Sequence, residues 1–253
     1  MIKKSFNNCV PAREAFKEAK ILSSLPETNS DGVPGHFLNP NIPILKSKSH
    51  LPHWHQDCKI QFVTFRLADS LPQEKLNYLK EIRNVVFRDG VSEEEKDLYY
   101  EKYGKKVDEW LDAGAGSCIM RKVEIRQIVE QTLLHFNNER YKLHAFVVMP
   151  NHVHALLELI NENKIGNILH SWKRFSAKAI NGFLGRTGVL WQHESFDRMI
   201  RHEAHYLRVV GYIKNNNPKI AVIFEEAKSL IKSFDFAPED RKIKEMILDE
   251  NNK

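Results

Sequence analysis

The sequence predicts an α+β fold in which helices cover one face of an antiparallel sheet. Three segments rich in β-branched and aromatic residues indicate strands at residues 59–67, 141–149 and 152–160. Only a Pro150–Asn151 break separates the last two segments, which is typical of an antiparallel hairpin. Segments with helical periodicity lie between the first strand and the hairpin and again after the hairpin, as a mixed fold of this kind requires.

The first 53 residues do not share this regularity. Residues 10–24 are compatible with a helix, but Pro, Gly and Asn then cluster between positions 29 and 43 and indicate irregular backbone. We therefore expect residues 1–53 to form an N-terminal extension. After the first strand, residues 73–112 are charged and helical in pattern, and glycines follow them, so residues 73–118 are expected to form a helical insertion.

The remaining helices are predicted where apolar residues recur at helical spacing. They cover residues 121–137, 164–184, 203–216 and 239–250. The helix over 203–216 must stop near Asn217 because Pro218 follows and restricts the preceding residue. Val189–Trp191 is expected to begin the fourth strand.

Four strands and two helices in this order predict a ferredoxin-like sandwich. Its sheet would be antiparallel and four-stranded, with helices on one face and extensions at both termini. Residues 54–225 would form this domain and residues 226–253 a C-terminal helical tail. The uncovered face of the sheet would then be available for a site.

The composition describes a mildly basic chain of 253 residues, with a net charge of +5 and a pI of about 8.9. This balance fits a polyanionic partner without requiring one. Cys9, Cys58 and Cys118 are too widely spaced for a zinc knuckle or a disulfide framework, and reduced thiols are expected. Without a signal peptide or a membrane-length apolar run, we expect a cytoplasmic protein.

His152 and His154 are the most conspicuous candidates for a metal site. Residues two apart on a strand share one face, and two buried imidazoles are costly unless a ligand binds them. The alternative is a pair of strand histidines satisfied by hydrogen bonds. A second pair, His53 and His55, follows Leu51–Pro52 and is assigned to a loop.

Tyr212 is the candidate nucleophile. A phenol oxygen can attack a phosphodiester and hold it as a covalent ester, although a pKa near 10 keeps most of it protonated. A cation held by the histidine pair would assist by polarising the phosphate. Asn216, four residues later, shares the helix face of Tyr212 and could supply a third ligand. Alternatively, Tyr212 is a core aromatic.

Basic side chains flank these candidates. Contacts to DNA phosphates would come from five residues, which are otherwise read as solvated helix faces: Lys173, Arg174, Lys178, Arg198 and Arg201.

Several ordered motifs resemble those of a known family. They are F-R-L-A-D-S-L-P (65–72), V-M-P-N-H-V-H (148–154), S-W-K-R-F-S-A-K-A-I-N (171–181), W-Q-H-E-S-F-D-R-M-I-R (191–201) and Y-I-K-N-N-N-P (212–218). Over residues 54–222 the chain resembles the REP-associated tyrosine transposases, related to insertion-sequence transposases. These are single-tyrosine members of the HUH nuclease superfamily, in which U is a bulky apolar residue, here Val153.

The resemblance implies strand cleavage and rejoining of single-stranded DNA with Mg²⁺ or Mn²⁺. His152 and His154 match the metal ligands and Tyr212 the nucleophile, which would form a 5′-phosphotyrosine. Substrates would carry a short palindromic hairpin, and a bacterial, nucleoid-associated monomer or homodimer is expected. Here Pro218 follows Tyr212 by six residues, where relatives commonly have five, so either Asn216 or Asn217 can be the third ligand.

Two other functions remain open on the sequence. A catalytically inactive, domesticated descendant would bind DNA hairpins without cutting them. A metal-dependent phosphodiesterase that uses water would cleave without Tyr212.

Overall fold

The computed structural model describes residues 35–39, 45–46, 54–56, 58–86 and 104–249. Its main sheet has five antiparallel strands in the order β6-β3-β5-β4-β7. The predicted strands correspond to β3 (Ile60–Arg66), β4 (Tyr141–Val148) and β5 (His152–Leu159). Met149, Pro150 and Asn151 connect β4 to β5 as a tight hairpin. The α+β class and the antiparallel sheet are therefore as predicted.

The two edge strands differ from the sequence-based expectation. The strand next to β3 is β6 (Phe196–Met199), whereas Trp191 makes only an isolated bridge with Leu67. The prediction that Val189–Trp191 begins this strand is thus wrong by several residues. On the other edge, the short β7 (Val222–Ile223) pairs with β4 and raises the strand number from four to five.

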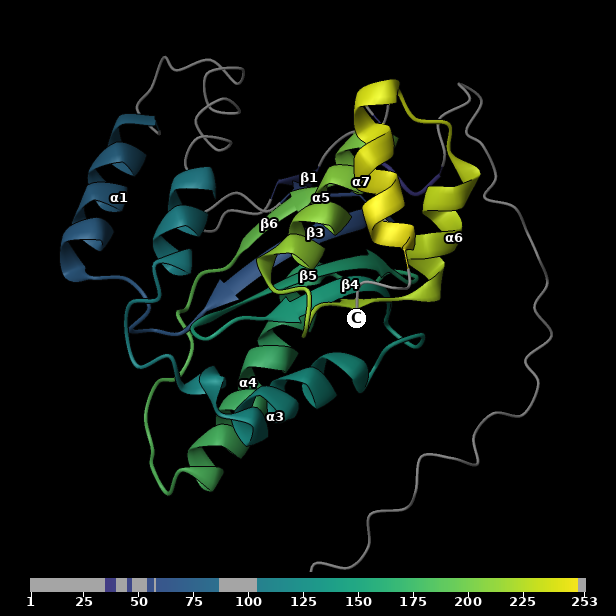
Figure 1. Ribbon diagram of the computed structural model, residues 1–253. Coiled ribbons are helices and arrows are strands. Elements are labelled where there is room, and N and C mark those ends of the chain that lie inside the picture. The colour runs from purple at the N-terminus through teal and green to yellow at the C-terminus, as the bar shows by residue number, and fades with distance from the viewer. Residues whose placement is uncertain (1–34, 40–44, 47–53, 57, 87–103, 250–253) are drawn as a thin grey trace, which may run out of the picture.

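Helices cover both faces of this sheet (Figure 1). On one face, α3 (Val123–Leu134) and α4 (Ile165–Phe183) pack on the odd-numbered residues of β5. On the other face, α5 (Glu203–Asn216) packs on the even-numbered residues. The first face is covered as predicted, but the second face is not open.

The C-terminal helices extend the second layer. The α6 helix (Glu225–Ser233), which the sequence reading did not include, and α7 (Pro238–Leu248) pack with α5 in one core. Phe37, from the N-terminal part of the chain, is fully buried in the same core. Residues of both expected extensions therefore contribute to the packing behind α5.

The insertion lies at one end of the sheet. Its described parts are α1 (Gln73–Val86) and helical residues 104–112, which stand side by side in Figure 1. A 3-10 turn, η1 (Ile119–Arg121), leads from the insertion into α3. The predicted helical character of the insertion is confirmed for these described residues.

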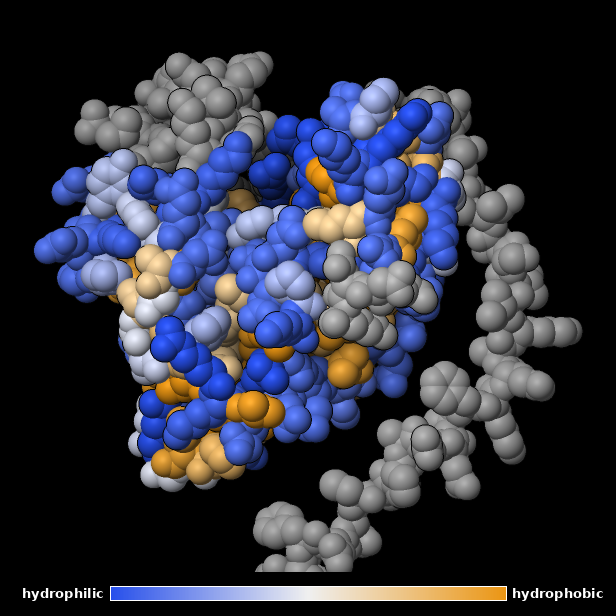
Figure 2. Space-filling model, in the orientation of Figure 1, coloured by the Kyte–Doolittle hydropathy of each residue, from blue (hydrophilic) through white to orange (hydrophobic). Residues whose placement is uncertain are grey.

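Two short strands, β1 (Leu45–Lys46) and β2 (Trp54–His55), pair separately from the main sheet. His55 therefore lies in a short strand, and His53 and the expected helix at 10–24 lie outside the described residues. Among the described residues, no helix combines the length and apolar character needed to cross a bilayer. Figure 2 shows a mostly hydrophilic face, with hydrophobic residues gathered over the ends of α3 and α4.

Candidate active site

Two imidazoles converge at the beginning of β5. His152 and His154 are two apart and point to the face that α5 covers. Both are fully buried, at 0% exposure, and their Nε2 atoms are 3.0 Å apart. The polar side chains thus lie inside the layer between sheet and helix, where each needs a partner.

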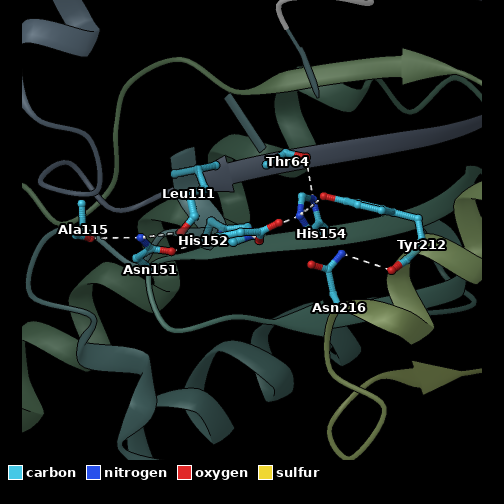
Figure 3. A network of polar contacts seen from close by, with 9 residues as sticks. Thr64, Leu111, Ala115, Asn151, His152, His154, Tyr212 and Asn216 are labelled. Carbon is cyan, nitrogen blue, oxygen red and sulfur yellow. Dashed lines mark hydrogen bonds and ion pairs between the residues drawn. The ribbon is translucent and has the colours of Figure 1, made fainter. Parts of the chain in front are cut away.

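Asn151 determines how His152 is oriented (Figure 3). Its Nδ2 donates to the carbonyls of Leu111, at 3.2 Å, and Ala115, at 3.0 Å. The amide oxygen is then left to accept from His152 Nδ1, at 2.8 Å. Because an amide oxygen only accepts, His152 carries its proton on Nδ1 and exposes a lone pair on Nε2.

His154 is oriented in a similar way from the neighbouring strand. Thr64 lies directly opposite it on β3, and the hydroxyl is 2.8 Å from His154 Nδ1. When Thr64 accepts this hydrogen bond, His154 Nε2 also carries a free lone pair. The ring of Phe62 stacks on the imidazole, with centroids 5.4 Å apart. Because the Phe62 ring covers one face of the imidazole, Nε2 is the part of the ring that is left for a polar contact.

The histidine pair fits a divalent cation. Burial lowers the pKa of His152 to about 3, and burial together with His152 lowers the pKa of His154 well below its usual value. Both rings are therefore neutral near pH 7, which is the form that binds metals. A bound cation would polarise a phosphate ester and stabilise the charge of its transition state. Within the described ranges, no three His, Cys, Asp or Glu side chains already surround one point.

Tyr212 extends from α5 toward this pair. Its hydroxyl is 3.2 Å from His154 Nε2, and the two ring centroids are 5.1 Å apart. The expected proximity of the phenol to the imidazoles is thus confirmed. Asp108 lies close enough to the hydroxyl for the two groups to shift each other's pKa. Burial, and then the charge of Asp108, raise the pKa of Tyr212, so the phenol keeps its proton near neutrality.

The helix of Tyr212 is clamped within its own chain. Gly211, the preceding residue, faces α7 so closely that a Cβ atom would lie 2.7 Å from Ile243 Cγ2. Lys214 donates to the backbone carbonyl of Met246. Only glycine allows this approach, so α7 fixes the position of α5 over the sheet.

The two candidate amides behave differently. Asn216 is the last residue of α5, and its Nδ2 donates to the Tyr212 carbonyl at 3.1 Å. This bond directs the amide oxygen toward the side of the histidine pair (Figure 3). Asn217 lies beyond the helix, and its side-chain oxygen accepts from the Lys219 N–H at 3.3 Å. Of the two, Asn216 has the free oxygen on the side of the site.

Two carboxylates of the insertion reach the site, and the sequence reading did not single them out. Asp112 Oδ1 is 3.8 Å from His152 Nε2, and Asp108 lies near the Tyr212 hydroxyl, which acts on its pKa. Burial, and then the charge of Asp112, raise the pKa of Asp108 to about 7. Their spacing of four, which places both on one helix face, is the signal that could have identified them.

The predicted DNA-binding residues separate into two groups. Arg198, on β6, lies close enough to lower the pKa of Asp108 and is on the side of the site, with the exposed Arg201 just beyond the strand. Arg174 and Lys178 are exposed on α4, which covers the opposite face of the sheet.

Lys173 has a different environment from its neighbours on α4. Its ammonium donates to the carbonyls of Gln192, His193 and Glu194, at 2.9, 3.0 and 3.3 Å. Burial lowers its pKa to about 8. Lys173 thus holds the loop against α4 and has no donor left for a phosphate. This loop and α4 enclose a pocket of about 720 Å³.

Comparison with known proteins identifies a family that part of this chain resembles. Residues 120–216 match the family model described as IS200-like transposase. This segment contains the histidine pair and the tyrosine helix, so the resemblance to single-tyrosine transposases is confirmed there.

Individual relatives are more distant. An uncharacterized protein of Haemophilus influenzae is 27% identical over 99 residues, which cover 30% of this chain and 53% of that protein. The chain thus spans about half the length of this curated relative. A solved structure of a REP-associated tyrosine transposase bound to a REP hairpin is 16% identical to this chain. The alignment covers 68% of this chain and 73% of the solved chain, and the TM-score is 0.40.

Proposed function

We propose that this protein cleaves and rejoins single-stranded DNA near a palindromic hairpin, as a tyrosine transposase using Mg²⁺ or Mn²⁺. Tyr212 is the nucleophile, and His152, His154 and Asn216 hold the cation. The observation that carries the proposal is the 3.2 Å distance from the Tyr212 hydroxyl to His154 Nε2. A phenol at this distance from a metal-binding pair is positioned to attack a phosphate held there.

The reaction is a balanced transesterification. The Tyr212 oxygen attacks the phosphorus, the phosphorus–O3′ bond breaks, and the 5′-phosphate becomes an ester of Tyr212. The phenol proton passes to the nearby Asp108 carboxylate, because the lone pair of His154 Nε2 is used to hold the cation. The departing 3′ oxygen gains a proton. One phosphoester replaces another, so attack by a 3′-hydroxyl can rejoin the strand without ATP.

The strand is expected to enter from the side of the insertion and β6. Arg198 and Arg201 would contact its phosphates there, because they lie on the site side of the sheet. Arg174 and Lys178 on α4 would contact the hairpin stem instead. Such contacts supply affinity that declines with salt and carry little sequence information.

The test is formation of a covalent adduct. The purified protein is incubated with 5′-extended hairpin DNA and Mn²⁺, and the adduct is measured by denaturing electrophoresis and mass spectrometry of the modified peptide. We expect a phosphate ester on Tyr212, no adduct with EDTA, and none with Tyr212→Phe. An adduct in the Tyr212→Phe protein would contradict the assignment, and release of free ends by that variant would favour hydrolysis by water.

A second candidate, hairpin binding without cleavage, is favoured by the raised pKa of Tyr212, whose phenol is buried beside a carboxylate. It predicts tight binding of hairpin DNA and no adduct with any divalent cation. The same assay, combined with fluorescence anisotropy of the labelled hairpin, distinguishes the two functions.

A further inference from the structure

The helical segment at residues 104–112 presents two carboxylates to the candidate site. Asp108 and Asp112 are four apart and therefore lie on one face of that helix. Asp108 lies near the Tyr212 hydroxyl, whereas Asp112 Oδ1 lies 3.8 Å from His152 Nε2. The two carboxylates thus meet different members of the site.

The contact between Asp112 and His152 is not an ordinary hydrogen bond. At 3.8 Å it is too long for one. The proton of His152 is on Nδ1, where it is donated to Asn151, so Nε2 faces the carboxylate with a lone pair. His154 Nε2 approaches the same atom at 3.0 Å. Three electron-rich atoms therefore face one region, and a cation between them would relieve their repulsion.

The separations are close to those of atoms that share one small cation. Ligands about 2.1 Å from Mg²⁺ in octahedral geometry are about 3.0 Å apart when adjacent and about 4.2 Å apart when opposite. The 3.0 Å between the two imidazole nitrogens equals the adjacent value, and the 3.8 Å from Asp112 Oδ1 to His152 Nε2 lies between the two values, so a small rotation of Asp112 would bring its oxygen into the same coordination sphere. Asp112 is also 44% exposed, so its side chain has room to rotate onto an incoming cation.

The preference of hard divalent cations for oxygen atoms also supports Asp112 as a ligand. Two imidazoles alone favour softer transition metals, whereas carboxylate oxygens favour Mg²⁺ and Mn²⁺. A carboxylate ligand would make the buried histidine pair a better site for Mg²⁺ or Mn²⁺. It would also neutralise one of the two positive charges of the bound cation.

We propose that Asp112 is a direct ligand of the divalent cation, together with His152 and His154. The segment at residues 104–112 then belongs to the metal site, because it supplies one ligand and, through the Leu111 carbonyl, orients another. This inference rests on the proposed metal-dependent function and names a ligand that comes from the insertion.

The experiment measures metal binding in the absence of DNA. Isothermal titration with MnCl₂ is carried out on the full chain and on Asp112→Asn, which keeps the size of the side chain. The matched control is Glu109→Gln, which removes the same charge from the same helix at a side chain that is 65% exposed. We expect the Mn²⁺ dissociation constant to rise tenfold or more for Asp112→Asn and less than about twofold for Glu109→Gln.

Thermal unfolding supplies an independent measurement. In EDTA the Asp112→Asn protein should unfold at or slightly above the temperature of the other two, because one repelling charge is removed, and Mn²⁺ should raise the unfolding temperature least for Asp112→Asn. Equal Mn²⁺ affinity in Asp112→Asn and the unchanged chain would overturn the ligand assignment and leave the proposed function intact. An unchanged chain that binds no Mn²⁺ and forms the Tyr212 adduct in EDTA would overturn both.

Discussion

Two polar clusters of similar composition lie on the same face of β5. At the beginning of the strand, His152 and His154 face Tyr212 from α5. Toward its end, Glu158 faces His144 at 3.7 Å. Each cluster combines imidazoles, a carboxylate and a tyrosine of the same helix, so residue type alone does not distinguish a reactive site from a structural one.

The Glu158 cluster is held together mainly by contacts among its own members. Its carboxylate contacts His36 Nδ1 at 2.5 Å and His144 Nε2 at 3.7 Å. The other nitrogen of His144 is 2.6 Å from the Tyr206 hydroxyl. Burial alone would raise the pKa of Glu158, but the contacts with His144 and His36 outweigh it and lower the pKa to about 2. An acidic group here sits between two imidazoles, and of the nitrogens that face it or Tyr206 only the buried His144 Nε2 makes no hydrogen bond.

The histidine pair has the reverse arrangement. Imidazole nitrogens face each other, and the carboxylate of Asp112 stands beside them rather than between them. The comparison teaches that an excess of converging acceptors, and not a collection of polar residues, distinguishes a candidate cation site from a structural cluster.

The largest expected difference between the two clusters is in their effect on the rate of adduct formation. His154→Ala removes a proposed metal ligand and the neighbour of Tyr212, so adduct formation should fall about 1000-fold or more. His144→Ala removes the same side chain from the other cluster and should leave the adduct rate within about threefold of the unchanged chain. Rates are measured by quenched electrophoresis on hairpin DNA. Equal losses in both variants would show that the clusters are not functionally distinct.

The next difference is in acid stability. The folded pKa of Glu158 is depressed from 4.5 to about 2, so its stabilisation is complete above pH 4.5 and is lost as the pH falls toward 2. With Glu158 only 13% exposed, this loss amounts to about 3 kcal/mol. Urea unfolding at several pH values should show it for the unchanged chain. Glu158→Gln should lack this component, and parallel curves for the two proteins would refute the assignment.

The sequence predicted the parts of this comparison that depend on local pattern. The bounds of α5, residues 203–216, are as predicted because apolar periodicity and Pro218 define both its face and its end. The β6 strand was misplaced because F-D-R-M is only four residues long and carries two charges. A strand this short becomes recognisable only when β3 pairs with it.

The rest of the site depends on long-range packing. His152, His154 and Tyr212 could be singled out from their motifs, but Asp108 and Asp112 lie in an insertion whose position no local pattern specifies. Their side chains approach the histidines only because the insertion folds against the hairpin, where Asn151 binds the Leu111 carbonyl. The Glu158 cluster could not be predicted either, since its members, Glu158 included, come from four separate segments.

Orientation of the histidine pair provides a third test. Asn151→Ala removes the acceptor that keeps the His152 proton on Nδ1, so Mn²⁺ affinity should fall about 10- to 100-fold. The control is Asn137→Ala, which removes an amide that accepts from the Leu143 N–H on the neighbouring strand. It should lower stability and leave Mn²⁺ affinity unchanged. If titration shows equal affinity for Asn151→Ala and the unchanged chain, the tautomer does not depend on this amide.

The smallest expected effect concerns the other tyrosine of α5. Tyr206 is fully buried, and its hydroxyl contacts His144 at 2.6 Å without reaching the histidine pair. Tyr206→Phe keeps the ring and removes one buried hydrogen bond, so the free energy of unfolding should fall by about 1 kcal/mol. Adduct formation should persist, because the reactive phenol lies six residues further along the helix. A loss of adduct in a protein that still unfolds cooperatively in urea would mean that the two clusters are coupled through α5 and act as one site.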